Sequence, residues 1–392
     1  MTEKSTKNIG LRGIRVADST ICFIDGENGR LYFRGYDIND LARYSSYYEV
    51  AYLLLHGVMP KGSELEQFIS ELRSQRELSA DMIAFLQRIP KSTPPMNVLQ
   101  STVASIEGFY PEPPDESKDA FTRKATRLIA QMPTIVATWD RIRKNLKLIT
   151  PDKKLSRAAN FLYMLKGEIP DEETAHDFDV CLILHAEHAF NASSFAARVV
   201  ASTRASMYSA VSAAIGSLSG ELHGGANSEV MGNLLEIGSP EKVENWVRGH
   251  LDEGKRIMGM GHAVYKTMDP RAVVLKQMAE NLVKRSGNPK WFNMTKTIEE
   301  VTKREFEKRK GGEIYPNVDL YSASVYYMMG ITPDLYTPVF AISRIAGWAA
   351  HILEERFPEP PVKPMLYRPL AEYRGNYCGT FGCEYVPLEK RT

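Results

Sequence analysis

Apolar positions recur at helical spacing along most of the chain. Ser46 and Glu49 form a capping box ahead of one apolar stripe, and Gly57 ends it. The range 338–356 is apolar on nearly every side, which predicts a central helix. The small-residue range 199–220 predicts a second buried helix, packed closely against others. Together these patterns predict an all-α fold.

Three segments depart from this pattern. The range 20–35 holds strand-forming residues on either side of Asn28 and Gly29, which predicts a small N-terminal β-hairpin. The range 291–310 predicts a highly charged helix with a solvated face, because its glutamates interleave with its lysines. The range 357–369 carries five prolines and predicts an extended linker to a non-helical tail.

The chain becomes more polar and loop-broken between about residues 224 and 324. We therefore expect a small domain at 224–324, inserted into a large helical domain formed by 1–223 and 325–392, the latter with the C-terminal tail. We find no fixed-period repeat, which argues against a helical solenoid.

Composition limits the choice of partners. The chain has 392 residues, 25% of them charged, and a formal net charge of +1. This balance gives no overall field to gather nucleic acid or an acidic membrane, so an anion site must be local. The N-terminal range 1–13 lacks the apolar core of a signal peptide, and no apolar run is long enough to span a bilayer. We expect a cytoplasmic protein.

The four cysteines are Cys22, Cys181, Cys378 and Cys383, and their small number suits a reducing compartment. Cys378 and Cys383 are close enough in sequence for a local disulfide or half of a metal site. We favour free thiols.

The stretch "MGMGHAVYKTMDPR" at 258–271 contains the first candidate chemistry. Its glycines predict a bent loop that projects His262. Asp269 can cap a helix, Pro270 suits the first helical position, and Arg271 then lies in the first turn. A cation at this end of a helix is unfavourable unless an anion joins it.

Two further stretches carry candidate groups. His223 lies in the glycine-rich turn "GELHGGAN", where Asn227 could cap the next helix. A position near a helix N-terminus would lower the pKa of the imidazole and favour the neutral ring as a donor, although a structural role is also open. Asp319, in "YPNVDLYSAS", opens a helix and could simply be its N-cap.

His185 and His188, in "LHAEHAFNAS", resemble a metal-ligand pair, but a site needs a third and a fourth donor. A non-catalytic, helical metal-binding protein is therefore a remote alternative, and we expect no metal. The glycine spacing of "GMGH" is incomplete for a dinucleotide site. A phosphate-binding GxxxxGK[ST] loop, a GxSxG elbow and a recognisable cysteine nucleophile motif are all missing.

In combination, these stretches are far more specific than each is alone. "LHAEHAFNAS", "GELHGGANSEV", "GMGHAVYKTMDPR" and "YPNVDLYSAS" occur in the order found in citrate synthases. "FIDGENGRLYFRGYDINDLA" and "EVAYLLLHG" near the front also resemble that family, so the resemblance covers nearly the whole chain. It implies a two-domain helical fold and condensation of acetyl-CoA with oxaloacetate, without a metal or redox cofactor.

The resemblance also implies catalytic roles. Asp319 would be the base that deprotonates the acetyl group, and His223 would donate a hydrogen bond to the thioester carbonyl. His262 would polarise the ketone of oxaloacetate and protonate its oxygen. A carboxylate alone is too weak a base for this carbon acid, so the reaction needs such donors.

The substrate ligands follow from the same resemblance. Oxaloacetate is a dianion, which favours arginines with bidentate geometry. Its implied ligands are His188, Asn191, Arg271, Arg344 and Arg368, the last contributed across a homodimer interface, with Arg374 as a weaker rival. The implied CoA-binding residues are Lys255, Arg256, Ile257, Met258, Gly259, Met260 and Lys266.

Two departures from the family pattern concern the acyl-CoA. Ala263 follows His262 where many short members have arginine. Ser322 and Ala323 replace the Ser-Gly that many citrate synthases carry, whereas 2-methylcitrate synthases often have Ser-Ala. A 2-methylcitrate synthase that prefers propionyl-CoA is thus the alternative function, since one methylene changes discrimination by only about 1–3 kcal/mol.

Overall fold

The computed structural model describes residues 9–11, 13–363, 365–375 and 382–391. A small antiparallel sheet of order β1-β2-β3 opens the chain, with strands β1 Cys22–Asp25, β2 Arg30–Phe33 and β3 Tyr36–Asp37. Cys22 pairs with Phe33 and Asp25 with Arg30, which confirms the predicted hairpin. The two-residue strand β3 was not predicted, because a pair of residues is too short for an alternating pattern.

The described residues form sixteen α-helices. In chain order they are α1 Ile38–Tyr44, α2 Tyr47–His56, α3 Gly62–Ser74, α4 Ala80–Arg88, α5 Pro95–Phe109, α6 Lys118–Arg143, α7 Arg157–Lys166, α8 Glu172–His185, α9 Ala192–Ser202, α10 Met207–Leu218, α11 Ala226–Ile237, α12 Val243–Asp252, α13 Pro270–Ser286, α14 Lys290–Lys310, α15 Val318–Met328 and α16 Tyr336–Arg356. The predicted all-α class is confirmed.

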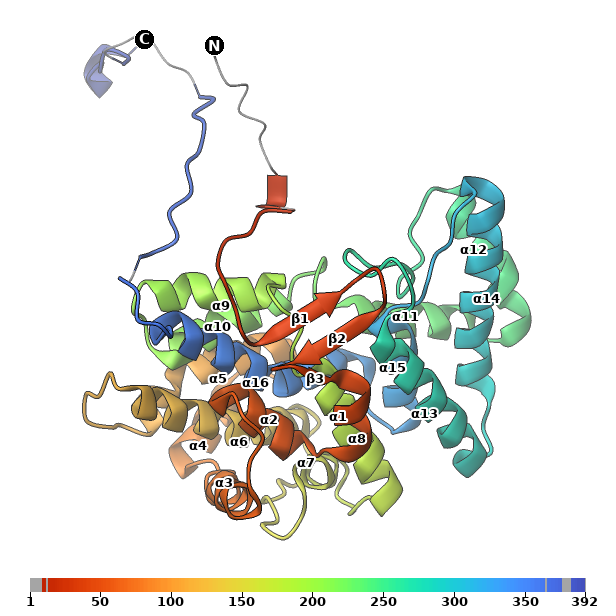
Figure 1. Cartoon of the computed structure of the whole chain (residues 1–392), viewed down its shortest axis with the longest axis horizontal. Helices are drawn as coiled ribbons and strands as arrows, with labels where there is room; N and C mark the ends of the chain where they lie inside the picture. The colour runs from red at the N-terminus through yellow and green to blue at the C-terminus, as the bar shows by residue number, and fades with distance from the viewer. Residues whose placement is uncertain (1–8, 12, 364, 376–381, 392) are drawn as a thin grey trace.

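Local signals give several helix ends correctly. Ser46 and Glu49 form a capping box at the start of α2, and Gly57 closes the helix in the left-handed conformation with a φ of 82°. Helix α16 is buried along nearly its whole length, as its all-round apolar pattern predicts, and it runs through the middle of the molecule (Figure 1).

The prediction of one helix over 199–220 is wrong. Helix α9 ends at Ser202, and α10 begins at Met207 after the N-cap Ser206. Between them Arg204 has a φ of 66°, which no α-helix accommodates. The small residues favour close helix packing, but the Ser206 side chain caps the backbone amide of Ser209 and so starts a new helix.

Helix α14 confirms the helix expected at 291–310, but its charged residues are only partly solvated. Glu299 is 2% exposed. Its carboxylate accepts hydrogen bonds from Lys276 at 2.9 Å, from Lys303 and from the Tyr321 hydroxyl. Three donors compensate the burial of this charge, so part of the charge pattern stabilises the packing of α13, α14 and α15.

Helices α11–α15 gather at one side of the molecule, where α12 and α14 project furthest from α3 and α4 (Figure 1). The hairpin β1-β2 crosses the face between this group and the remaining helices. This group overlaps the expected range 224–324, although α15 continues to Met328, so the expected boundary after 324 falls inside a helix. The division into two domains stays a prediction.

Residues 357–363 and 365–375 contain no helix or strand, in line with the linker predicted at 357–369, and beyond the contacts of Tyr367 with α9 the chain runs away from the helical body (Figure 1). Cys383 is disulfide-bonded, so the expectation of a free thiol is wrong for this residue, while Cys378 lies outside the described residues. No helix within the described ranges combines the length and apolarity needed to cross a bilayer.

Candidate active site

The His262 loop is bent by two glycines. Gly259 and Gly261 have φ values of 82° and 83°, which favour glycine. A Cβ on Gly259 would also lie 2.8 Å from the Leu320 Cα, so the loop contacts α15 directly. Asn317 holds the loop in place: its amide donates to the Gly259 carbonyl at 2.9 Å, and its Nδ2 donates to the Gly261 carbonyl at 2.8 Å. The loop and the start of α15 therefore form one local unit.

The hydrogen bonds of His262 define its tautomer. Nδ1 accepts the amides of Val264 at 3.0 Å and Tyr265 at 3.2 Å. A nitrogen that accepts carries no proton, so the neutral ring has its proton on Nε2. Burial lowers the pKa of His262 to about 4, and the positive charge of Arg271 adds to this effect. At neutral pH His262 is an uncharged ring whose remaining donor is Nε2–H.

His223 has the opposite tautomer. It lies in the turn between α10 and α11, and its Nε2 accepts the Ser193 amide at 3.2 Å and lies 2.9 Å from the Ser193 hydroxyl. The proton of the neutral ring is therefore on Nδ1. Burial lowers the pKa to about 4, with the charge of Arg344 as the second cause, so the predicted lowering arises mainly from burial.

The expectation that Asn227 caps α11 is wrong. The N-cap is Gly225, which offers no side chain, and Asn227 lies fully buried in the first turn. Neither polar atom of its carboxamide has a hydrogen-bond partner among the described residues.

Asp319 lies in the first turn of α15 but does not cap it. The N-cap is Asn317, whose Oδ1 accepts the Asp319 amide at 2.9 Å, so the N-cap interpretation of Asp319 is wrong. We find no hydrogen bond to the Asp319 carboxylate within the described ranges. Burial raises its pKa to about 6, against the opposing effect of Arg271. The carboxylate is therefore an unusually basic one.

The anion that joins Arg271 is Asp269. Asp269 caps α13, and its two carboxylate oxygens accept Nε of Arg271 at 3.0 Å and a terminal nitrogen at 2.8 Å. Both residues are almost fully buried. The carboxylate also accepts the Val318 amide at 3.2 Å, which links the start of α13 to the start of α15. The capping geometry was predicted correctly, and its carboxylate already provides one anion for the first-turn arginine.

Arg344 lies in the middle of α16 and is 1% exposed. Its Nε donates to the His185 carbonyl at 2.7 Å, and its guanidinium lies 4.7 Å from the centre of the Phe340 ring. Within the described residues we find no carboxylate in ion-pair contact with it. Burial lowers its pKa to about 10. A buried guanidinium is energetically costly unless an anion pairs with it, so Arg344 is a candidate ligand for an anionic group of a substrate.

His188 and Asn191 lie in the turn between α8 and α9. His188 Nε2 is 3.2 Å from the Tyr265 hydroxyl, and its ring packs edge-on against His262 with centroids 5.3 Å apart. Asn191 caps α9, and its side-chain Nδ2 donates to the carbonyls of His188 and Ala189. Ala189 has a φ of 49°, so Asn191 holds a strained turn.

These groups converge electrostatically on one place. After burial, the charge of Arg271 is the next cause of the lowered pKa of His188 and His262 and also opposes the raised pKa of Asp319. Arg344 likewise adds to the lowered pKa of His188 and His223 and opposes that of Asp319. The contacts agree with this: the rings of His188 and His262 are 5.3 Å apart, and Asp269 links Arg271 to the Val318 amide beside Asp319. The charges of the two arginines therefore act on three histidines and one carboxylate of a single region.

The predicted CoA-binding residues surround the His262 loop with varied exposure. Ile257 is buried, whereas Lys255, Arg256 and Lys266 are exposed. Lys255 forms an ion pair with Glu253 at 2.7 Å. The Lys266 amide donates to the Gly26 carbonyl at 2.9 Å, so the hairpin turn braces this loop. Met258, Gly259 and Met260 lie along the loop between Ile257 and His262.

Arg368 does not join these groups in its own chain. It is exposed in the extended tail, next to Tyr367, whose amide donates to the Ser202 hydroxyl at 3.4 Å. Arg374, the rival candidate, is exposed as well and pairs with Glu372 at 2.9 Å.

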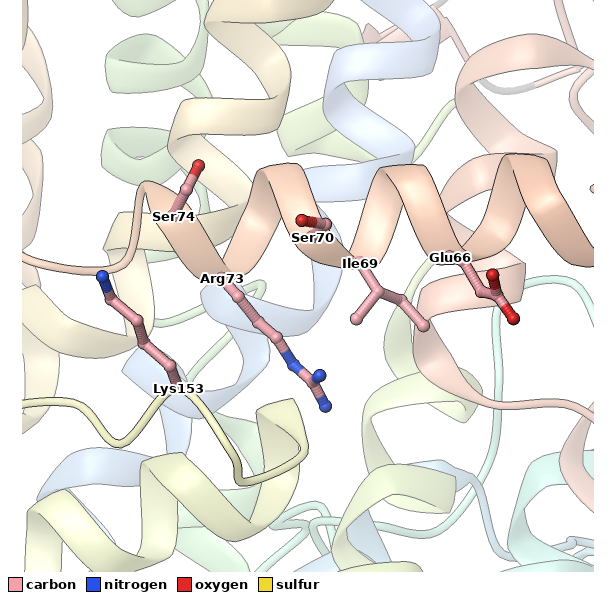
Figure 2. Close-up of a pocket in the computed structure, with 6 residues that line it drawn as sticks. All are labelled: Glu66, Ile69, Ser70, Arg73, Ser74 and Lys153. Atoms are coloured by element: carbon pink, nitrogen blue, oxygen red, sulfur yellow. The ribbon is translucent and has the colours of Figure 1, made fainter.

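His185 and His188 do not act as a ligand pair. His185 Nδ1 lies 2.8 Å from the Cys181 carbonyl, while His188 faces Tyr265. In the parts of the chain that the structure describes, no three His, Cys, Asp or Glu side chains are placed to hold a metal ion. A separate cavity of about 510 Å³ lies between α3 and the loop carrying Lys153, where Arg73 and Lys153 face it (Figure 2). None of the predicted site residues lines it.

Three contributors to the site were not predicted: Ser193, Tyr265 and Asn317. Each fixes a predicted residue by a hydrogen bond. Asn317 could have been recognised from its position two residues before Asp319, because asparagine is a strong N-cap. Ser193 lies 30 positions from His223, and no local signal links the two.

Two neutral imidazoles with fixed donors, an unusually basic carboxylate and buried arginines define an acid–base site for an anionic substrate. A family model described as "Citrate synthase, C-terminal domain" matches residues 10–370. The citrate synthase of Haloferax volcanii is 43% identical over 392 residues, spanning 97% of this chain and 98% of the relative. The 2-methylcitrate synthase of Mycobacterium tuberculosis is 39% identical over 368 residues, spanning 94% and 90% of the two chains.

Among solved structures, the fold is similar to that of citrate synthase from the archaeon Thermoplasma acidophilum, solved as a ternary complex with carboxymethyl coenzyme A and oxaloacetate. That match has a TM-score of 0.89 at 31% identity and covers 98% of this chain and 100% of the other. The protein described here belongs to the citrate synthase family.

Proposed function

We propose that the protein condenses acetyl-CoA with oxaloacetate and water to give citrate and CoA. The observation that carries the proposal is the buried Asp319 carboxylate, whose pKa burial raises to about 6, in a region that also holds two imidazoles with fixed tautomers. The acetyl methyl group is a very weak acid, so a base of this strength acts only if its partners stabilise the developing enolate.

Each side chain then has one step. Asp319 takes a proton from the acetyl methyl carbon while Nδ1–H of His223 donates to the thioester oxygen. The resulting nucleophilic carbon attacks the ketone carbon of oxaloacetate, and Nε2–H of His262 polarises the ketone oxygen and protonates it as the new bond forms. Water then hydrolyses the citryl thioester and releases CoA.

Charge balance supports a homodimer. Asp269 neutralises Arg271, and Glu187 is the carboxylate whose charge acts most on Arg344. When Asp319 is ionised as well, the carboxylates at the site offset both arginines. The site of a single chain then has no net positive charge with which to bind a dianion. An additional cation is required, and we propose that Arg368 of the partner subunit supplies it, together with the oxaloacetate ligands His188, Asn191, Arg271 and Arg344 of the chain itself.

The CoA ligands and the domain closure remain proposals that rest on the loop geometry. The exposed Lys255, Arg256 and Lys266 would contact phosphates, and the backbone from Ile257 to Met260 would meet the adenine. Closure of 224–324 over the large domain would exclude water from the thioester until condensation is complete.

Acetyl-CoA is the acyl donor that we propose. The residue that motivated propionyl-CoA, Ala323, is fully buried, and its carbonyl accepts the Tyr336 hydroxyl at 2.9 Å. It therefore presents no surface to an acyl chain in this conformation. We propose that no metal or redox cofactor takes part, since hydrogen bonds stabilise the enolate. The expected cytoplasmic location stays a prediction, which the disulfide at Cys383 does not support.

The direct test supplies acetyl-CoA and oxaloacetate in EDTA and follows free CoA thiol, with propionyl-CoA in parallel. We expect thiol release with a higher kcat/KM for acetyl-CoA. No release from either thioester would refute the proposed reaction, and a clear preference for propionyl-CoA would replace it with the alternative.

A further inference from the structure

Arg198, on α9, is a buried arginine that contacts α16, the turn before α9 and the C-terminal tail. It is 3% exposed. One terminal nitrogen donates to Glu354 at 2.7 Å and the other pairs with Glu355 at 2.8 Å. Its guanidinium also lies 4.8 Å from the centre of the Phe190 ring. Phe190 belongs to the turn of His188 and Asn191, which we call the oxaloacetate turn and define as residues 186–191.

A second chain of contacts leads from Arg198 into this turn. Arg198 donates to Nδ1 of His351 at 3.3 Å, and an arginine has no acceptor, so the proton of a neutral His351 is on Nε2. Nε2 lies 3.0 Å from Glu187, and His351 and Glu187 have no exposed surface. Arg198 thus fixes the tautomer that lets His351 hold Glu187.

Glu187 is well placed to affect substrate binding. It directly precedes His188, and the carbonyl two residues before it, that of His185, accepts Nε of Arg344. It also packs on α16, since a Cβ on Gly347 would lie 2.2 Å from its Oε2. A shift of Glu187 would therefore move His188 and the backbone acceptor of Arg344 together.

The opposite side of Arg198 contacts the tail. The Tyr367 hydroxyl donates to Glu355 at 3.1 Å and accepts a hydrogen bond from Arg198. The Tyr367 ring packs edge-on against Phe195, with centroids 5.4 Å apart. Arg368 is the next residue along the tail.

We propose that Arg198 is a positioning residue that couples two substrate-binding segments: the oxaloacetate turn of its own chain and the tail segment bearing Arg368, which serves the partner subunit. The inference rests on the proposed function. When Tyr367 packs against α9, its hydroxyl helps to fix Glu355 and Arg198. Arg198 then orients His351, which holds Glu187 and with it the oxaloacetate turn. Ordering of the tail for one site therefore supports oxaloacetate binding at the other.

The test measures both KM values and kcat in the full-length protein for Arg198→Lys, Tyr367→Phe and the double variant. Lysine keeps a charge for Glu354 and Glu355 but lacks the planar fork that also reaches His351. Tyr367→Phe removes one hydroxyl and keeps the ring contact. We expect the KM for oxaloacetate to rise about ten-fold in Arg198→Lys and about three-fold in Tyr367→Phe, with kcat within about three-fold and the KM for acetyl-CoA nearly unchanged.

Arg127→Lys is the matched control. Arg127 pairs with Glu112 at 2.7 Å, lies 4.9 Å from the centre of the Tyr110 ring and reaches the Tyr208 hydroxyl at 3.4 Å, but has no contact with the site. It should change neither KM. The KM for oxaloacetate in the double variant should be no higher than in Arg198→Lys alone, because both substitutions break the same chain of contacts from Tyr367 to Glu187.

Three results are decisive. A KM for oxaloacetate in Arg198→Lys equal to that of Arg127→Lys would overturn the positioning role. Effects of Arg198→Lys and Tyr367→Phe that multiply in the double variant would overturn the coupling to the tail. Absence of thiol release by the unmodified protein would instead refute the proposed function, which separates the two failures.

Discussion

The Ser193 amide donates a hydrogen bond of 3.2 Å to Nε2 of His223, across 30 positions of sequence. The Ser193 hydroxyl lies 2.9 Å from the same nitrogen and accepts the indole N–H of Trp348 at 3.1 Å. Because Nε2 is occupied as an acceptor, Nδ1 carries the proton and becomes the donor available to a substrate carbonyl.

His223→Gln should therefore separate binding from chemistry. The proposed role of His223 concerns the thioester, so oxaloacetate affinity should stay within about two-fold, while kcat falls by about 10²–10³ through loss of an oriented donor. Calorimetric titration with oxaloacetate and a thiol-release assay measure the two quantities. A parallel loss of oxaloacetate affinity would contradict the assignment, and His262→Gln, whose proposed role concerns the ketone, should show that loss.

The pH dependence of kcat/KM should report Asp319. Burial raises its pKa to about 6, and a general base acts only when deprotonated. We expect kcat/KM for acetyl-CoA to fall about ten-fold per pH unit below pH 6 and to be level just above it. His223 and His262, whose pKa values burial lowers to about 4, stay neutral across pH 6–8 and add no change there. A midpoint near 4 would show that the carboxylate is not the buried group that the structure indicates.

Asp319→Asn should stabilise the protein at alkaline pH. A raised carboxyl pKa means that the folded state disfavours the charge, so the cost is fully present above about pH 6 and disappears below the ordinary value of 3.8. We expect the free energy of unfolding to rise on the order of 2 kcal/mol at pH 8, with most of the gain lost at pH 4. Thermal unfolding followed by circular dichroism at the two pH values measures this.

Asp179→Asn is the matched control for that substitution. Burial also raises the pKa of Asp179 to about 6, and its carboxylate accepts the Tyr47 amide at 2.8 Å, which an asparagine oxygen can still accept. It should show a pH trend of the same sign while kcat is retained. If Asp319→Asn instead destabilised the protein more at pH 8 than at pH 4, the pKa of Asp319 in the folded protein would be lowered rather than raised.

Mixed dimers should test the role of Arg368. In a dimer of one Asp319→Asn chain and one Arg368→Ala chain, one site carries both defects and the other carries neither. Random mixing of two inactive variants should therefore restore about a quarter of the unmodified activity, since half of the dimers are mixed and half of their sites are intact. A mixture no more active than its components would place Arg368 outside the neighbouring site.

Sequence patterns predicted the features that depend on neighbours along the chain. The capping box at Ser46, the bent loop around His262 and the cap at Asp269 each involve residues within a few positions of one another. The interruption at Arg204 and the capping role of Asn317 were also local. The small residues around Arg204 are compatible with one helix or two, and both Asn317 and Asp319 are residue types that can cap a helix, so the sequence left these alternatives open.

Contacts between distant segments could not be read from the chain. The tautomer of His223 depends on Ser193. The lowered pKa of Arg344 depends on its burial beside the His185 carbonyl, with no ion-paired carboxylate among the residues that the structure describes. The resemblance to citrate synthases indicated which residues meet, and packing decides how each is oriented and charged.

The most direct test of the account is the rate of CoA thiol release from acetyl-CoA and oxaloacetate, in EDTA at pH 8, for the unmodified protein and for Asp319→Asn. If Asp319 is the base, the unmodified protein releases thiol rapidly and the variant releases it about 10²–10⁴ times more slowly, the range expected for loss of a general base. Equal rates for the two proteins, or no release by the unmodified protein, would contradict the account.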